Sequence, residues 1–242
     1  MSQEIAKVQS GALMQAEGVQ RGFEGGVDRE DLIIPRAKLM QALSPELTEG
    51  LEGIKVGSVI NSLTKEVLPQ EFIPIFMFKN YIRFNPRSKD DPNFDSEFDP
   101  GAVIWKSTDP LDPKVKAEAR FGPNGEKPVA TTFINFFSYF PGVPMPIIVS
   151  FSKTSYKAGK NLLSLAKFCG GDMFSRKYKL VSQMETNDIA TYAVLKVAPI
   201  GDALAEEYAV CERLWNDFAS KANAIQVHEE DAQEDVAEKR PY

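Results

Sequence analysis

Residues 147–198 constrain the fold more than any other part of this 242-residue chain. The sequence there predicts a strand rich in β-branched residues (147–153), an amphipathic helix (156–168) and a hairpin (176–185 and 189–198). Ser155 is placed to cap the helix, and Gly-Gly-Asp follows its end. A Greek-key barrel of the OB type is built from five strands, with a helix between the third and the fourth. The segment therefore favours an OB-like barrel.

The first half of the chain supplies the remaining strands. Residues 56–84 predict two strands and a turn, and the second strand alternates from Phe72 onward, so that Lys79, Tyr81 and Arg83 share one face. An aromatic strand follows at 129–140. Residues 202–225 have apolar side chains at helical spacing and predict a C-terminal helix.

We therefore expect one OB-like nucleic-acid-binding domain at residues 27–222. A flexible arm (1–26) precedes it, and a disordered acidic tail (223–242) follows. The domain carries a long Asp/Pro-rich excursion at 85–128 with one short strand, Ala-Val-Ile-Trp-Lys-Ser. The expected class is mainly β with helices, and the alternative left open is a small α+β sheet.

Charge alternates along the chain, which carries a formal net charge of -6. Residues 54–89 have 6 basic and 2 acidic side chains, and residues 150–200 have 8 and 3. Residues 201–242 have 4 and 11, which makes the C-terminal part strongly acidic. Such asymmetry indicates an anionic partner for the two basic segments and a separate role for the tail.

Several classes of protein are disfavoured by what the sequence contains. It has two cysteines far apart and one histidine, so we expect a reducing compartment and no zinc cluster. It shows no phosphate-binding loop, no nucleophile elbow and no zinc-protease helix. No secretory signal or membrane span is evident. We expect a non-enzymatic, cytoplasmic protein without cofactor or metal, and the oligomeric state stays open.

Basic and aromatic side chains are interleaved at four places, in Phe-Lys-Asn-Tyr-Ile-Arg-Phe, Ile-Trp-Lys, Ser-Tyr-Lys and Arg-Lys-Tyr-Lys. Binding of a single strand requires cations for the phosphates and aromatic faces for the bases. The predicted DNA-binding residues are Lys79, Tyr81, Arg83, Phe84, Trp105, Lys106, Lys153, Tyr156, Lys157, Lys160, Arg176, Lys177, Tyr178 and Lys179.

The tail is the second functional signal. An anionic tail can occupy a cationic groove until nucleic acid displaces it, or it can bind replication and recombination proteins. The residues predicted for this role are Glu229, Glu230, Asp231, Glu234, Asp235 and the terminal Tyr242.

Two stretches resemble bacteriophage single-stranded DNA-binding proteins of the OB-fold type. They are DREDLIIPRAKLMQALSPEL with GSVINSLTKEVL, and PIIVSFSKTSYKAGKNLLSLAKF with FSRKYKL and NDIATYAVLKV, within residues 27–200. The resemblance implies an OB-fold core, an acidic C-terminal tail and a role in phage DNA replication or recombination. It assigns no individual binding residue.

Two alternatives remain at this point. A phage structural or host-takeover protein without DNA binding would use the aromatic strand as a protein interface, with Phe133, Phe136, Phe137, Tyr139 and Phe140 exposed. A metal-dependent nuclease would use the acidic residues of the 90–99 loop.

Overall fold

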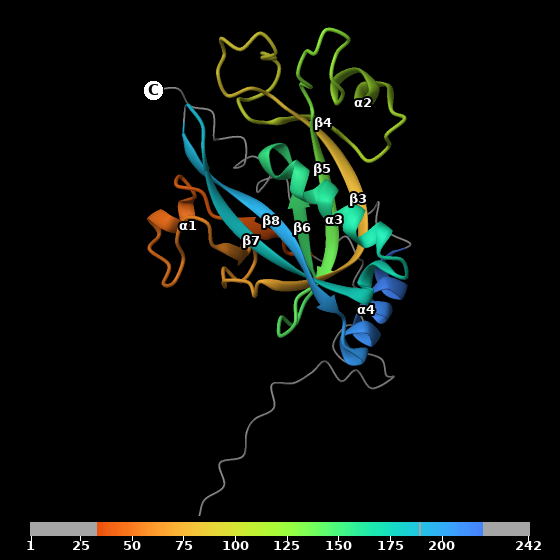
Figure 1. Ribbon diagram of the computed structural model, residues 1–242. Coiled ribbons are helices and arrows are strands. Elements are labelled where there is room, and N and C mark those ends of the chain that lie inside the picture. The colour runs from red at the N-terminus through yellow and green to blue at the C-terminus, as the bar shows by residue number, and fades with distance from the viewer. Residues whose placement is uncertain (1–32, 189, 220–242) are drawn as a thin grey trace, which may run out of the picture.

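The computed structural model describes residues 33–188 and 190–219 (Figure 1). They form a mainly β structure with one large antiparallel sheet, a two-stranded sheet and several helices. The predicted fold class is confirmed. The predicted arm (1–26) and tail (223–242) lie outside the described residues.

Five long strands make up the large sheet. They are β3 (Glu71–Phe84), β5 (Thr131–Tyr139), β6 (Ile147–Phe151), β7 (Arg176–Thr186) and β8 (Thr191–Asp202), paired in the order β6-β5-β3-β7-β8. A sixth strand, β4 (Val103–Ser107), pairs with the end of β3. Helix α3 (Tyr156–Phe168) connects β6 to β7, and α4 (Ala205–Phe218) follows β8.

In a closed OB-type barrel the third strand pairs with the fifth. Without that pairing, the strand order of the barrel is the one seen here. Taking β3, β5, β6, β7 and β8 as the first to fifth strands, the helix lies between the third and fourth, as predicted. No ladder joins β6 to β8 among the described residues, so the barrel is open along this line, which we call the seam.

A β-bulge in β3 corrects the predicted alternation. The pairing of β3 with β5 shifts between Pro74 and Phe76, so two residues of β3 oppose one of β5. Phe72 therefore packs inside the barrel, whereas Phe76 and Phe78 lie on the outer face. Simple alternation had placed all three on one face, because a bulge leaves no recognisable mark in a run of apolar residues.

The inside of the barrel is a core of aromatic and aliphatic side chains. Phe72, Phe136, Phe151 and Tyr178 are fully buried there, and the Phe136 and Phe151 rings meet edge to face at 5.8 Å. Helix α3 covers one side with its buried stripe of Ala158, Leu162 and Ala166.

Helix α4 covers the outer face of β3 and β5. Phe218 of α4 lies with its ring 5.2 Å from that of Phe137, and Cys211 is buried in the same cluster. Burial raises the pKa of the Cys211 thiol to about 12, so it stays protonated. Phe133, Phe136, Phe137 and Phe140 are at most 2% exposed, and Tyr139 is partly buried against the same cluster. The alternative that uses this strand as an exposed protein interface is therefore wrong in its choice of surface.

A small sheet lies beside the barrel. Strand β1 (Ala37–Leu39) pairs with β2 (Val59–Asn61), and the short helix α1 (Pro45–Thr48) connects them. Burial of Glu46 opposes its ionisation, but hydrogen bonds from Lys38 and Lys65 outweigh this and lower its pKa to about 2. The charged carboxylate therefore anchors Lys38 at 2.8 Å.

The excursion after β3 is ordered by its own polar side chains. It contains the predicted strand as β4 and a short helix, α2 (Pro113–Glu118). The buried Asn85 amide donates to carbonyl oxygens of Asp95, Phe98 and Asp99, which closes the loop on itself. The carboxylates of Asp91 and Asp95 accept backbone N–H groups two residues ahead.

Replacing Gly159 of α3 by alanine is expected to destabilise the protein, although alanine is the better helix former by about 1 kcal/mol. A Cβ at this position would lie 2.7 Å from Cβ of Phe151, a carbon held next to the backbone of β6. Overpacking costs about 1–3 kcal/mol, so we expect a net loss of about 1–2 kcal/mol in the free energy of unfolding. Urea denaturation measures it, and Ser164→Ala, at an exposed position of the same helix, is the control. A Gly159→Ala protein as stable as the wild type would contradict the packing argument.

Candidate nucleic-acid interface

The seam between β6 and β8 is bridged by the segment around β1. Ile148 N donates to Pro35 O at 2.9 Å on the β6 side. On the β8 side, the Gln41 side chain makes two hydrogen bonds of 2.9 Å with the backbone of Ala193. The β1 segment thus stands where a closing ladder would run, but it fills the seam only in part.

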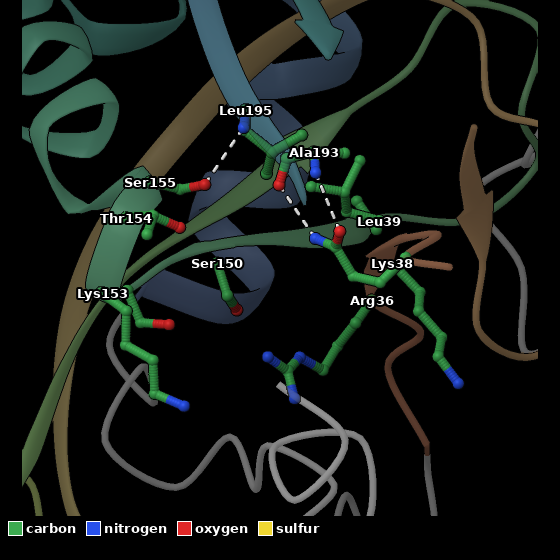
Figure 2. Close-up of a pocket in the computed structure, with 12 residues that line it drawn as sticks. Arg36, Lys38, Leu39, Ser150, Lys153, Thr154, Ser155, Ala193 and Leu195 are labelled. Atoms are coloured by element: carbon green, nitrogen blue, oxygen red, sulfur yellow. Dashed lines mark hydrogen bonds between the residues drawn. The ribbon is translucent and has the colours of Figure 1, made fainter. Parts of the chain in front are cut away.

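A cavity of about 60 Å³ remains in the seam. Figure 2 shows Arg36 and Lys153 on either side of Ser150 in this cavity. The third cation of the lining is Lys38, which is ion-paired with Glu46. None of the described residues that line the cavity is acidic. Arg36, Lys153 and several hydroxyl groups, with no acid among the described lining residues, are suited to an anion.

The backbone at Lys153 is strained. Its φ is +44°, in the left-handed region that side chains other than glycine rarely adopt. Lys153 begins the 3-10 turn (Lys153–Ser155) through which β6 passes into α3. Such strain costs about 1–3 kcal/mol and is concentrated at functional sites. The turn directs the chain from the seam into the first turn of α3.

The N-terminus of α3 has no side-chain cap. Ser155 was predicted to cap the helix, but it makes no side-chain cap hydrogen bond. Its hydroxyl oxygen instead accepts from Leu195 N of β8 at 3.0 Å, which helps to hold the seam. The first turn contains no acid and carries Lys157, which is exposed. The helix dipole and the lysine thus add positive potential beside the cavity.

Tyr156 connects this helix end with the predicted patch on β3. The Nζ of Lys160 lies 5.4 Å from the centre of the Tyr156 ring. Burial raises the pKa of the Tyr81 phenol, and the nearby Tyr156 raises it further while Arg120 lowers it. The influence of Tyr156 on the Tyr81 phenol indicates that the two side chains lie near each other. The patch at Lys153–Lys160 therefore lies near Tyr81, which shares one face of β3 with Lys79.

We call this set the seam surface. It comprises Arg36 and Lys38 of the cavity, Lys153, Tyr156, Lys157 and Lys160 of the turn and helix, and Lys79 and Tyr81 of β3. Tyr156 is its most accessible aromatic ring, since Tyr81 is only 8% exposed.

The predicted patch 176–179 does not belong to this surface. Lys179 pairs with Glu71 at the start of β3, eight residues from Lys79, or about 26 Å along an ideal strand. Arg176 is ion-paired with Asp202 and Lys177 with Glu207. Tyr178 is fully buried, so the prediction that its ring offers a stacking face is corrected.

Two further predicted residues, Arg83 and Trp105, hold the excursion in place. Arg83 Nη1 lies 3.0 Å from Glu118 Oε2, and the Trp105 indole N–H donates to the same oxygen at 3.0 Å. Trp105 and Phe84 are 9% and 8% exposed, so neither ring is open for stacking. Lys106 is exposed on β4, opposite Ile82.

Sequence reasoning missed Arg36 and Lys38. The signal for them was present, because they are two residues apart, and such residues share a face where the chain is extended. Arg36 and Lys38 line the same cavity as Lys153 only because of the open seam, which the sequence does not predict.

The carboxylates of the Asp-rich loop do not gather at one point. Among the described residues, no group of three or more His, Cys, Asp or Glu side chains is placed to hold a metal ion. Likewise, no helix in the described part of the chain has the length and apolar character needed to cross a membrane.

Fold and surface together define a β-rich domain with OB-type strand order and, at its open seam, a cavity whose described lining residues include cations and no acid. The chain belongs to the Pam3 phage gp34-like protein family, whose model matches residues 4–224. It is thus a bacteriophage-type protein. Comparison with curated proteins and with solved structures gave no match.

Proposed function

We propose that this protein binds single-stranded DNA without sequence preference, as a non-enzymatic component of phage DNA replication or recombination. The observation that carries the proposal is the meeting of the cationic cavity with Tyr156 and Tyr81 at the seam surface. Single-strand binding combines a cationic path for the backbone with aromatic faces for the bases.

Each part of the seam surface has a distinct role in this proposal. The cavity of about 60 Å³ has room for a phosphate-sized group, and Arg36 and Lys153 would bind it by charge-assisted hydrogen bonds. Tyr156 would stack on a base, and Lys157 and Lys160 would follow the adjacent phosphates. Because these contacts address the backbone and base faces, binding would tolerate any sequence.

The direct test is a titration of labelled oligo-dT and of a duplex of equal length, each at low and at physiological salt. We expect preference for the single strand and steep weakening with salt, since counterions are released on binding. Equal affinity for both DNAs, or none for either, would remove the proposal.

The acidic tail gives a separate prediction. Deleting residues 228–242 is expected to tighten binding by about tenfold at low salt and by less at physiological salt, because the tail's charges compete with DNA and salt screens them. A full-length variant with Gln and Asn in place of the tail's acids should behave like the deletion. Unchanged or weaker binding by both proteins would argue against competition.

A further inference from the structure

A second groove lies where one edge of β3 has no strand partner. In the sheet order β3 lies between β5 and β7. Strand β7 pairs only with Glu71 and Phe72, and β4 joins the same edge only from Tyr81 onward. Among the described strands, none pairs with this edge of β3 from Ile73 to Asn80. An open edge of eight residues is longer than an average strand.

The groove along this edge has a volume of about 360 Å³. Residues Ile75 to Met77 of β3, Met173 and Phe174 of the turn before β7, and Trp215 of α4 line it. Trp215 is 45% exposed, while Phe76 beside the same groove is 8% exposed. A half-exposed tryptophan next to a buried apolar floor is typical of an anchor point for a protein partner.

The charge of this groove is opposite to that of the seam cavity. Asp172 and Glu212 line it, and none of the described lining residues is a cation. Acidic side chains repel a phosphate backbone and attract lysine and arginine. Nucleic acid is therefore a poor occupant, and a basic segment is a good one.

We propose that this groove binds an extended segment of a partner protein in which apolar and basic residues alternate. The segment would add to the sheet as a strand and pair with β3 between Ile75 and Asn80. Its apolar side chains would pack on Trp215, and its basic ones would face Asp172 and Glu212. The side-chain oxygen of Asn80, buried and without a hydrogen-bond partner in the described structure, lies at the far end of this edge.

An extended partner is favoured over a helix, because only an extended backbone can pair with the N–H and C=O groups of a strand edge. A second copy of this chain is a poor occupant for another reason. Its described segments with alternating basic and apolar residues, at 36–39, 114–117 and 177–181, already lie in or directly beside β1, α2 and β7. The proposal is separate from DNA binding, since no lining residue of the groove belongs to the seam surface.

The test uses the full-length protein and a labelled synthetic peptide that alternates lysine and valine. Hydrogen exchange followed by mass spectrometry should show slower exchange of residues 75–80 when the peptide is bound. Glu212→Lys and Trp215→Ala should each weaken peptide binding by about tenfold or more. Glu206→Lys, an equal charge change outside the groove lining, should have little effect. Thermal unfolding of each variant shows whether its fold is kept.

Two control peptides separate the parts of the proposal. Replacing lysine by glutamate should abolish binding, and placing proline at alternate positions should do the same, because proline has no N–H for the ladder. Equal binding of the proline peptide, no protection of residues 75–80, or full affinity of Glu212→Lys would overturn the proposal. Self-association that Trp215→Ala abolishes would instead assign the groove to a second copy. Oligo-dT affinity should be the same in all these variants, so failure here and failure of DNA binding are distinguishable.

Discussion

Replacing Lys153, Lys157 and Lys160 together by glutamine is expected to weaken binding of oligo-dT by about 100-fold at roughly 0.1 M salt. All three lie at the turn and first helical turns of α3, where the cavity meets Tyr156. Each phosphate contact on a single strand contributes about 0.7 to the slope of log affinity against log salt. The triple variant should therefore lower that slope by about 2, which fluorescence anisotropy at several salt concentrations measures.

A matched variant controls for the loss of charge. Lys55, Lys114 and Lys179 are exposed and lie outside the seam surface, so their triple replacement by glutamine removes the same charge elsewhere. We expect it to change the affinity by less than about threefold through long-range electrostatics alone. Equal weakening in both triple variants would mean that binding follows net charge, and the seam surface would lose its assigned role.

The strand and helix pattern of this protein could be predicted because it depends on local periodicity. The sequence predicts an apolar stripe of Ala158, Leu162, Leu165, Ala166 and Cys169 on the helix. The first four face the core, whereas Cys169, just after the helix end, is exposed. The bulge after Pro74 could not be predicted, because the segment is apolar on both sides of it and either face would bury well. The open seam depends on pairing between strands that are distant in the sequence, and the local pattern of apolar and polar residues does not specify such pairing.

The candidate site was predictable only in part, since charge and aromatic content identify residues but not the direction in which they face. Residues 176–179 show the same interleaving of basic and aromatic residues as Lys79–Tyr81 and Lys153–Lys160. Residues 176–179 differ because β7 lies between β3 and β8, which buries Tyr178 and brings acidic partners to Arg176 and Lys177. Only the tertiary structure separates these two outcomes.

The fold places basic and acidic segments of the sequence at two different cavities. Both cavities occur where the ladder between strands is interrupted, one between β6 and β8 and the other along β3. The first is lined by cations from segments far apart in the chain, and the second by acids of α4 and of the turn before β7. An acidic protein can thus present a locally cationic surface to DNA while an acidic groove stays available for a protein partner.

Replacing Tyr156 by alanine is expected to weaken oligo-dT binding by about 1–3 kcal/mol, or roughly 5- to 150-fold, if its ring stacks on a base. Tyr156→Phe keeps the ring and should stay within about threefold of the wild type. Oligomers of abasic nucleotides keep the phosphates and lack the bases, so the alanine variant should bind them almost as the wild type does. Fluorescence anisotropy with both oligomers separates stacking from charge. A loss of equal size on both would show that Tyr156 only supports the helix end.

Tyr178→Phe is the control, because it removes a tyrosine hydroxyl in the core of the barrel and leaves the seam surface unchanged. The Tyr178 hydroxyl is buried and has no hydrogen-bond partner among the described residues. Removing an unsatisfied buried hydroxyl relieves a desolvation penalty, so the variant should be as stable as the wild type or more stable by about 1 kcal/mol. Its oligo-dT affinity should not change, because the ring lies in the core. Weaker binding by Tyr178→Phe with unaltered stability would mean that DNA reaches the inside of the barrel, and the seam surface would then be only its entrance.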